Sequence, residues 1–274
     1  MLLRPRASPT LVRTAVASPQ SPAMLQALYR FLDQLGEVGL LSRDFFRTLF
    51  RRRFEMRLFL DQLDSVGALS FNVVSLTAIF SGMVLALQMG QFLAKFGAKI
   101  YVSRIMGLSL MREMGPVLSA LMIAARVGAG ITAELGTMKV TEQIDAMRAL
   151  AASPVRKLVV PRVMATVVML PLLTIYADAV GLAGGYFIAV SQLGVSGDYF
   201  YNSLVHNTEL GDFFSGVGKS VFFGFEIAII ACTYGLGATG GADGVGRATT
   251  SAVVAASITV LISDFFLTKL FLSI

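Results

Sequence analysis

Long apolar stretches alternate with short polar ones along the chain, and five of them are long enough to cross a membrane. They cover residues 66–90, 106–133, 158–192, 213–236 and 249–271. A membrane-spanning helix needs about 20 consecutive apolar residues, whereas β-barrel strands would alternate apolar and polar residues in period two. The pattern therefore predicts an all-α, polytopic membrane protein with about five transmembrane helices. Because Pro171 lies inside the third stretch, that helix is expected to be tilted, kinked or broken.

The segment before the first stretch, residues 24–65, mixes apolar and basic positions at helical spacing. Its apolar face includes Phe46 and Phe50, and its basic residues are Arg43, Arg47, Arg51, Arg52, Arg53 and Arg57. This pattern is typical of helices that lie in the membrane interface, although a soluble helical hairpin is the alternative. Residues 1–23 contain arginines but no acid and predict a disordered tail, with a weak likeness to a transit peptide. The membrane domain is then residues 66–274.

The distribution of basic residues predicts the orientation of the chain. One side carries the arginines of residues 24–65 and the loop after the second stretch, with Lys139, Arg148, Arg156, Lys157 and Arg162. The opposite side carries Lys95, Lys99 and Arg104, and it has no Lys or Arg between residues 192 and 212. Because short cytoplasmic loops are enriched in Lys and Arg, we expect a cytoplasmic N-terminus and an external C-terminus.

The loop between the second and third stretches contains a short amphipathic pattern. Val140, Ile144 and Met147 recur at helical spacing, while Glu142, Asp145 and Arg148 lie off that apolar face. We expect a helix of about 12 residues that starts near Thr137 or Thr141 and ends before Ser153 and Pro154. It is too short to span and must lie along the cytoplasmic surface. It either packs on its own bundle or inserts into a groove of a soluble partner.

Composition supports a membrane protein and argues against several other classes. The chain has 274 residues, of which 55% are hydrophobic and 15% charged, with a net charge of +6. Because the basic residues lie beside apolar stretches, anionic lipid headgroups are expected as partners and nucleic acid is not. A single cysteine, Cys232, and a single histidine, His206, argue against a disulfide and against a cysteine or histidine metal site.

Two glycine-rich segments resemble nucleotide-binding motifs only superficially. The segment SGVGKS at 215–220 has Phe213 where a P-loop needs glycine, and an apolar stretch follows it. The segment GLGATG at 235–240 leaves no room for a βαβ unit. We therefore expect no ATP, dinucleotide or other cofactor on this chain.

Several charged residues fall within the apolar stretches, where each should face protein or a wet cavity. They are Arg112, Glu113, Arg126, Asp178, Lys219, Glu226 and Asp264. Arg126 is expected to pair with a neighbouring helix. Arg112, Glu113 and Lys219 share one membrane level on the external side. They either form structural salt bridges or line an outward-facing site that meets a lipid headgroup.

Two further patterns concern packing. Leu85, Leu93 and Phe96, with Gln88 as a polar exception, form an apolar wall at the end of the first stretch or simply face the bilayer.

Rows of small residues allow close helix approach, either within one subunit or across a two-fold interface. These rows are Ala120, Ala124 and Gly128, and Ala177, Gly181 and Gly185. Because five spans are only half of a transporter, we expect a homodimer.

Several ordered blocks of the sequence resemble the MlaE permease family. They include SGMVLALQ at 81–88, MREMGPVLSALMIAARVGAGITAELGTM at 111–138, MKVTEQIDAMRALAASPVRKLVVPR at 138–162 and KSVFFG at 219–224. This family supplies the membrane subunit of bacterial ABC transporters that move phospholipids between the inner and outer membranes and maintain outer-membrane lipid asymmetry. The resemblance implies a multi-pass permease of the bacterial inner membrane, which is not itself an enzyme.

The resemblance also implies partners and site residues. ATP hydrolysis would belong to a separate cytoplasmic ABC ATPase, with a STAS-domain protein and a hexameric periplasmic MCE-domain protein as further partners. The coupling helix would contact the ATPase through Glu142, Asp145 and Arg148, while Ile144 and Met147 fill its cleft or brace the helix. The phospholipid site would open toward the periplasm near Arg112, Glu113 and Lys219, bordered by Leu85, Gln88, Leu93 and Phe96. The alternative is an ion-coupled secondary transporter, which the absence of an evident internal repeat disfavours.

Overall fold

The structure, a computed structural model, describes residues 23–51 and 55–273, and all regular elements in these ranges are helical. In chain order they are α1 (Ala23–Arg51), α2 (Met56–Ala94), η2 (Lys99–Tyr101), α3 (Val102–Ser109), η3 (Leu110–Met114), α4 (Gly115–Ile123), η4 (Ala124–Gly128), α5 (Ala129–Val140), α6 (Gln143–Ala149), η5 (Val155–Val159), α7 (Val160–Ser191), α8 (Gly197–Asn207), α9 (Leu210–Leu236) and α10 (Gly241–Ser273). Segments η3, η4 and η5 are π-helical turns. The all-α prediction is confirmed, and the predicted tail lies almost wholly outside the described residues.

Five helical stretches in the described ranges are long and apolar enough to cross a membrane. They are Met56–Ala94, Lys99–Val140, Val155–Ser191, Leu210–Leu236 and Gly241–Phe271, here called spans 1 to 5. Each coincides with one of the predicted apolar stretches, which confirms their number and order. Span 2 is assembled from α3, α4 and α5, with π-helical turns at their junctions.

The chain divides into two units between Leu40 and Leu41. The described part of the first unit is the beginning of α1, which exposes Tyr29, Leu32 and Leu35. This pattern fits the predicted amphipathic helix. The second unit holds all five spans.

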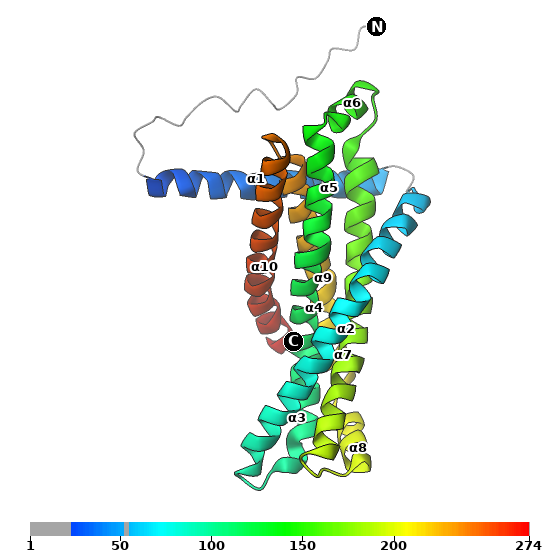
Figure 1. The fold of residues 1–274 in the computed structure, drawn as a ribbon, viewed down its shortest axis with the longest axis vertical. Coiled ribbons are helices and arrows are strands. Elements are labelled where there is room, and N and C mark those ends of the chain that lie inside the picture. Colours follow the sequence, from blue (N-terminus) through cyan, green and yellow to red (C-terminus); the bar gives the residue numbers. More distant parts are fainter. Residues whose placement is uncertain (1–22, 52–54, 274) are drawn as a thin grey trace. The chain divides into compact units, whose positions relative to one another are not determined.

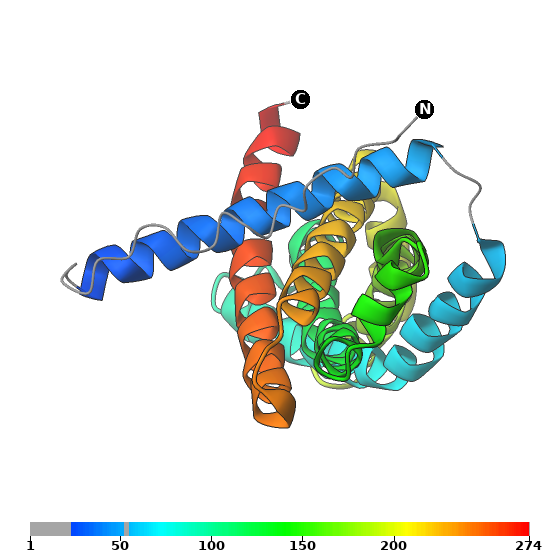
Figure 2. The same ribbon diagram turned by 90° about the horizontal axis from the view of Figure 1, so that it is seen from above.

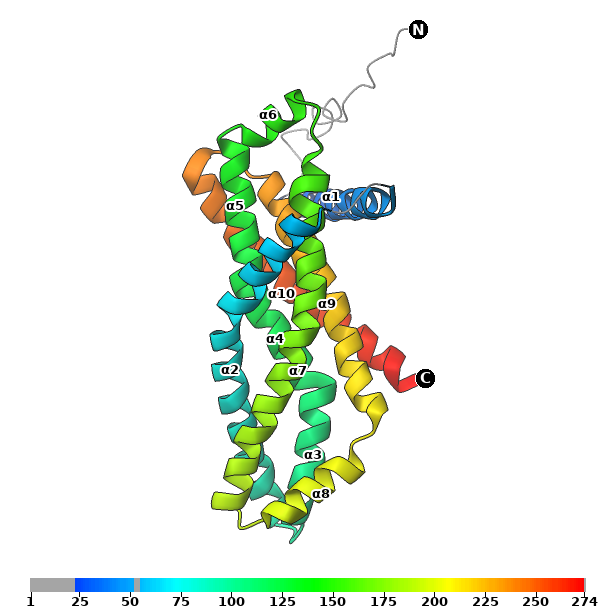
Figure 3. The ribbon, with the colours of Figure 1, turned by 90° about the vertical axis from the view of Figure 1, so that its right-hand side faces the viewer.

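Within the second unit the spans form one bundle. Helix α7 packs against both α2 and α9, while α10 packs against α9 and α5. Seen along the bundle, α2 and α10 lie on opposite sides with α5, α7 and α9 between them (Figure 2). A side view places α2 and α9 on opposite sides of α7 (Figure 3). Helix α6 lies at one end of the bundle, and α3 and α8 lie at the other, here called the α6 end and the α8 end (Figure 1).

Both predicted rows of small residues lie inside the chain. On α7, a Cβ at Gly181 would contact the backbone oxygen of Ala78, and one at Gly185 would overlap the side chain of Met106. On span 2, Ala120 and Ala124 are fully buried, and Gly128 faces Ile227 of α9. Small side chains in these rows thus let α7 approach α2 and span 2 approach α9, and the rows pack spans within one subunit.

Of the alternatives expected for the third span, a break is excluded, because helix α7 is continuous through Pro171. Two local expectations differ from the structure. The helix predicted between spans 2 and 3 has 7 residues rather than about 12, because α5 continues to Val140 and Glu142 adopts a left-handed conformation with φ 59°. Thr141 does not cap it, since its hydroxyl donates to the carbonyl oxygen of Thr137 within α5.

Candidate functional site

A cluster of charged residues around Lys219 joins spans 2, 4 and 5. The Lys219 side chain is only 1% exposed, and its ammonium group donates to Glu113 Oε2 at 2.8 Å and to Asp264 Oδ1 at 3.1 Å. It also lies within 2.6 Å of Thr268 Oγ1 and 3.0 Å of the Arg112 carbonyl oxygen. The Thr268 hydroxyl in turn donates to Glu113 Oε1 at 3.2 Å. A buried lysine has three protons to place, and this cluster supplies acceptors for all of them.

Arg112, on the same π-helical turn as Glu113, forms a second ion pair. Its guanidinium group donates to Asp212, which is 2% exposed. The other carboxylate oxygen of Asp212 accepts the backbone N–H of Glu209 at 3.0 Å as part of the capping box of α9. Asp212 therefore holds Arg112 and caps α9 at the same time. We call Arg112, Glu113, Asp212, Lys219, Asp264 and Thr268 the charged cluster.

The charged cluster has one buried and one exposed side. Lys219 and Asp212 are buried, whereas the side chains of Arg112 and Glu113 are 41% and 40% exposed. Lys219 thus braces Glu113 from within the protein. The surface presented outward is an adjacent cation and anion, Arg112 and Glu113, set among apolar spans.

The structure brings together the three charged residues that share a predicted membrane level. Lys219 binds Glu113 directly and reaches Arg112 through its carbonyl oxygen. The sequence pattern predicts Asp264 only as an intramembrane charge, and it contains no prediction for Asp212 or Thr268. Asp264 and Thr268 stand at i,i+4 on one helix face, and this spacing is the signal that would have placed Thr268 beside Asp264.

The remaining intramembrane charges have different environments. Glu226 accepts a hydrogen bond from Ser263 Oγ at 2.8 Å, and Arg162 pairs with Glu134 at 2.7 Å. Asp178 is buried beside Gly115. The expectation that Arg126 pairs with a neighbouring helix is wrong for the described residues, among which it is exposed and forms no ion pair.

The residues predicted to form an apolar wall are divided between the core and the surface. Leu85 is 7% exposed and belongs to a core cluster with Val102, Met106 and Phe200. Leu93 packs against that cluster and is partly buried. Gln88 is exposed, as is Phe96, which is 71% exposed and packs its ring edge-to-face on Phe92. Of the four, Gln88 and Phe96 are available to a bound molecule on this surface.

The second candidate surface is α6, at the opposite end of the bundle from α3 and α8 (Figure 1). Ile144 is fully buried and Met147 half-buried, so these two side chains brace α6 on the chain itself. Glu142 and Arg148 are exposed, and Leu150 at the end of the helix is 82% exposed. Helix α6 is therefore an anchored projection with an apolar side chain at its tip.

Asp145 organises the polar side of α6. It accepts from Lys139 Nζ at 2.8 Å and from Arg148 Nη1 at 3.0 Å. The hydrogen bond and charge of Lys139, with the charge of Arg148, hold the pKa of the Asp145 carboxyl below its usual range. These bonds tie the start of α6 to the last turn of α5.

Comparison with known proteins identifies the family. The model of the family described as Permease MlaE matches residues 59–270. A probable ABC transporter permease protein of Rickettsia felis is 42% identical over 245 residues, which cover 89% of this chain and 95% of that protein. The intermembrane phospholipid transport system permease protein MlaE of Haemophilus influenzae is 34% identical over 89% of this chain and 98% of its own length.

A plant protein is also similar. The chloroplastic protein TRIGALACTOSYLDIACYLGLYCEROL 1 of Arabidopsis thaliana is 37% identical over 212 residues, or 77% of this chain and 61% of the plant protein. The matched region of the family model contains α6, the charged cluster and all of the five spans except the first three residues of span 1 and the last residue of span 5. The chain is a multi-pass helical membrane protein that belongs to the MlaE permease family.

Proposed function

We propose that this chain is the membrane subunit of an ABC transporter that moves phospholipid and is driven by a separate cytoplasmic ATPase. The Rickettsia and Haemophilus relatives, named as an ABC transporter permease and a phospholipid transport permease, support this proposal. In this arrangement the bacterial inner membrane contains the chain, and the transported lipid passes between the inner and outer membranes.

The observation that carries the proposal is the exposed pair of Arg112 and Glu113 on the charged cluster. A phospholipid headgroup carries a phosphate, and an arginine guanidinium binds phosphate with two parallel hydrogen bonds. Asp212 holds the arginine, and Lys219 holds the glutamate, so the pair is preorganised. Gln88 on span 1 and Phe96, just after its end, are further exposed polar and apolar side chains available to a lipid.

Helix α6 is the proposed contact with the ATPase. Its buried Ile144 transmits any displacement of α6 to the bundle, while Glu142, Asp145, Arg148 and the exposed Leu150 face the partner. The positive-inside rule supports a cytoplasmic α6 end, because this end carries Lys139, Arg148, Arg156 and Lys157. The charged cluster then lies toward the periplasmic side.

The remaining partners follow from the proposed role. A single bundle of five spans supports a two-fold homodimer that encloses the lipid path, and its interface uses surfaces other than the two buried rows of small residues. A STAS-domain protein on the cytoplasmic side and a hexameric MCE-domain protein on the periplasmic side complete the proposed complex.

Purification of the complex from its native membrane tests the proposal. We expect an ATPase to co-purify with the full chain and mass spectrometry to detect bound phospholipid. The double substitution Glu142→Lys with Asp145→Lys should remove the ATPase but leave the dimer intact. Recovery of the chain without an ATPase and without phospholipid, or ion flux in place of lipid transfer, would contradict the proposed function.

A further inference from the structure

Among the residues that the structure describes, Arg126 is a cation without a partner in the middle of an apolar span. It is exposed, and it forms no hydrogen bond or ion pair with another described residue. By contrast, Arg112, Lys219 and Arg162 in the spans each have a carboxylate. A charged side chain in the hydrocarbon region is costly unless it meets a counter-charge or water. The described residues give Arg126 no counter-charge, and an anion from a bound molecule would supply one.

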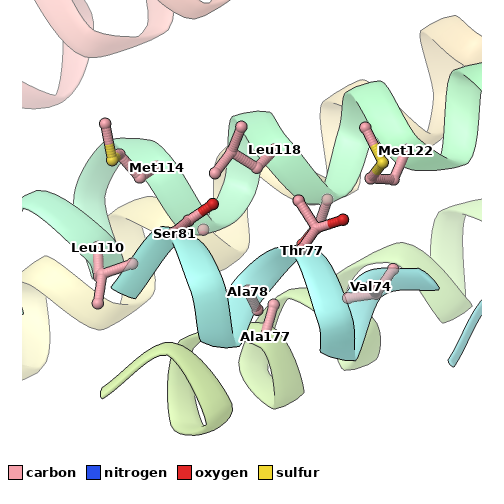
Figure 4. A pocket seen from close by; sticks show the side chains of 11 residues that line it. Val74, Thr77, Ala78, Ser81, Leu110, Met114, Leu118, Met122 and Ala177 are labelled. Atoms are coloured by element: carbon pink, nitrogen blue, oxygen red, sulfur yellow. The ribbon is translucent and has the colours of Figure 1, made fainter. Parts of the chain in front are cut away.

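Arg126 continues a row of apolar side chains that borders a groove. Met114, Leu118 and Met122 follow one side of span 2, beside Thr77 and Ser81 of α2 (Figure 4). These residues line a shallow groove between spans 1 and 2, and Ala177 of α7 also lines it. Arg126 follows Met122 by four residues and lies on the π-helical turn η4, just past the residues that line the groove.

In the sequence of span 2, the apolar row lies between the charged cluster and Arg126. Met114 directly follows Glu113, so one end of the row adjoins the cluster. With a rise of about 1.5 Å per residue, Arg126 lies about 20 Å further along the span than Glu113. This distance is comparable to the length of a lipid acyl chain. Both ends of the row carry a π-helical turn, η3 with Glu113 and η4 with Arg126, and such turns recur at functional sites.

The direction in which span 2 runs favours contact of the Arg126 side chain with a ligand beside the apolar row over contact with solvent at the α6 end. Side chains of a helix lean toward its N-terminus. The N-terminus of span 2 lies at the α8 end, so we expect the Arg126 side chain to lean toward the apolar row and away from the α6 end. The acid two turns further along this face, Glu134, already binds Arg162 at 2.7 Å.

We propose that Arg126 binds the phosphate of a membrane phospholipid whose acyl chain lies along the Met114, Leu118 and Met122 row. This inference rests on the proposed function and adds a second lipid-binding position to it. Charge complementarity identifies the occupant, because a guanidinium flanked by an apolar row matches a phosphate attached to an acyl chain. The two positions, at Arg126 and at Arg112 with Glu113, would hold a lipid successively during transfer.

Photo-crosslinking tests the assignment. The full chain is reconstituted with its ATPase in vesicles of phosphatidylethanolamine and phosphatidylglycerol, with a photoreactive amino acid in place of Met122. The readout is phospholipid phosphorus in the crosslinked band. We expect Arg126→Gln to lower this signal about tenfold, which corresponds to the loss of one charge-assisted hydrogen bond. Arg126→Lys, which keeps the charge, should restore most of it.

Matched controls separate phosphate binding from general contact with the bilayer. Arg104→Gln removes an exposed arginine from the same span outside the groove and should leave the Met122 signal unchanged. A crosslinker in place of Leu76, which is 62% exposed on α2, should label lipid independently of Arg126. Thermal unfolding and chromatographic elution of each variant verify that it is folded.

Three outcomes would overturn the inference. They are an unchanged Met122 signal in Arg126→Gln, an equal loss at Leu76, and a crosslink from Met122 to a second copy of the chain. The last would identify this row as a protein interface. Failure of the proposed function itself is distinguishable, because the unsubstituted complex would then neither retain nor transfer phospholipid. If transfer persists and depends on Glu113 while Arg126→Gln has no effect, only the second position is refuted.

Discussion

Lys219 and Glu113 are 106 positions apart in the chain, yet the ammonium nitrogen of the lysine lies 2.8 Å from Oε2 of the glutamate. The same ammonium group binds Asp264, so one buried cation links spans 2, 4 and 5. The exposed face of this link is the Arg112 and Glu113 pair. The buried ammonium group of Lys219 thus fixes the position of the Glu113 carboxylate on the surface that a lipid would contact.

Removal of the central cation should destabilise the bundle. In Lys219→Met, the carboxylates of Glu113 and Asp264 lose their shared partner, at an expected cost of about 3–5 kcal/mol of unfolding free energy. Thermal unfolding in detergent micelles measures the effect. Lys95→Met, at an exposed position, is the control and should unfold like the parent chain. Equal stability of Lys219→Met and the parent would show that Lys219 does not brace the cluster.

Loss of the exposed carboxylate should affect lipid binding more than folding. Glu113→Gln keeps a polar group beside Lys219 and Thr268 but removes the carboxylate that would bind the ammonium group of a phosphatidylethanolamine headgroup. We expect retained phospholipid to fall about tenfold, the change produced by loss of one charged contact. Asp198→Asn, on the exposed surface of α8, removes one carboxylate elsewhere and should have no effect. Wild-type lipid content in Glu113→Gln would assign the cluster a purely structural role.

The tip of α6 should determine binding of the ATPase. Leu150→Asp places a charge where an 82% exposed leucine now projects, and it disturbs no buried contact. We expect co-purification of the ATPase to be lost while insertion and thermal stability persist. Leu210→Asp is the matched control, because Leu210 is 77% exposed but lies outside α6. Undiminished ATPase binding by Leu150→Asp would remove α6 from the proposed interface.

The order of α6 should depend on pH through Asp145. The pKa of this carboxyl is lowered in the folded chain by Lys139 first and Arg148 second, so its stabilising contribution is present above the unfolded pKa. It is lost as pH falls below about 4 through the folded pKa. Hydrogen exchange of α6 amides should therefore show protection that decreases on acidification. In Asp145→Asn this dependence should disappear, and persistence would refute the role of Asp145.

Long apolar stretches revealed the number and order of the spans, but they could not reveal where each helix ends. Helix α2 begins at Met56 rather than near residue 66, because Asp61 and Asp64 continue the helix without adding apolar character. Helix α8 lies in a segment whose polar composition concealed it, and α6 is shorter than its periodicity indicates. Helix ends depend on local backbone conformation and tertiary contacts, which periodicity does not record.

The part of the candidate site that could be predicted from the sequence is the part that depends only on how deep each charged residue lies in the membrane. Arg112, Glu113 and Lys219 share a level, and the structure brings them together. The burial of each side chain could not be inferred from the sequence. Lys219 was expected at an outward-facing site but is buried and holds Glu113 in place, and Leu85 was expected on a lipid-facing wall but lies in the core. Arg126 is the opposite case, because the cost of a membrane charge predicted a partner within the chain and the described residues provide none. The packing of the helices determines whether an intramembrane charge pairs with another residue of the chain or is left free for a ligand.

The most direct test of the central claim is ATP-dependent phospholipid transfer from proteoliposomes that contain the full chain with its ATPase. A fluorescent phospholipid in donor vesicles and an acceptor MCE-domain protein provide the readout. We expect transfer that requires ATP, falls about tenfold in Glu113→Gln as expected for one lost charged contact, and is unchanged in Asp198→Asn. Transfer that is absent from the unsubstituted complex, or that proceeds equally in Glu113→Gln, would contradict the account.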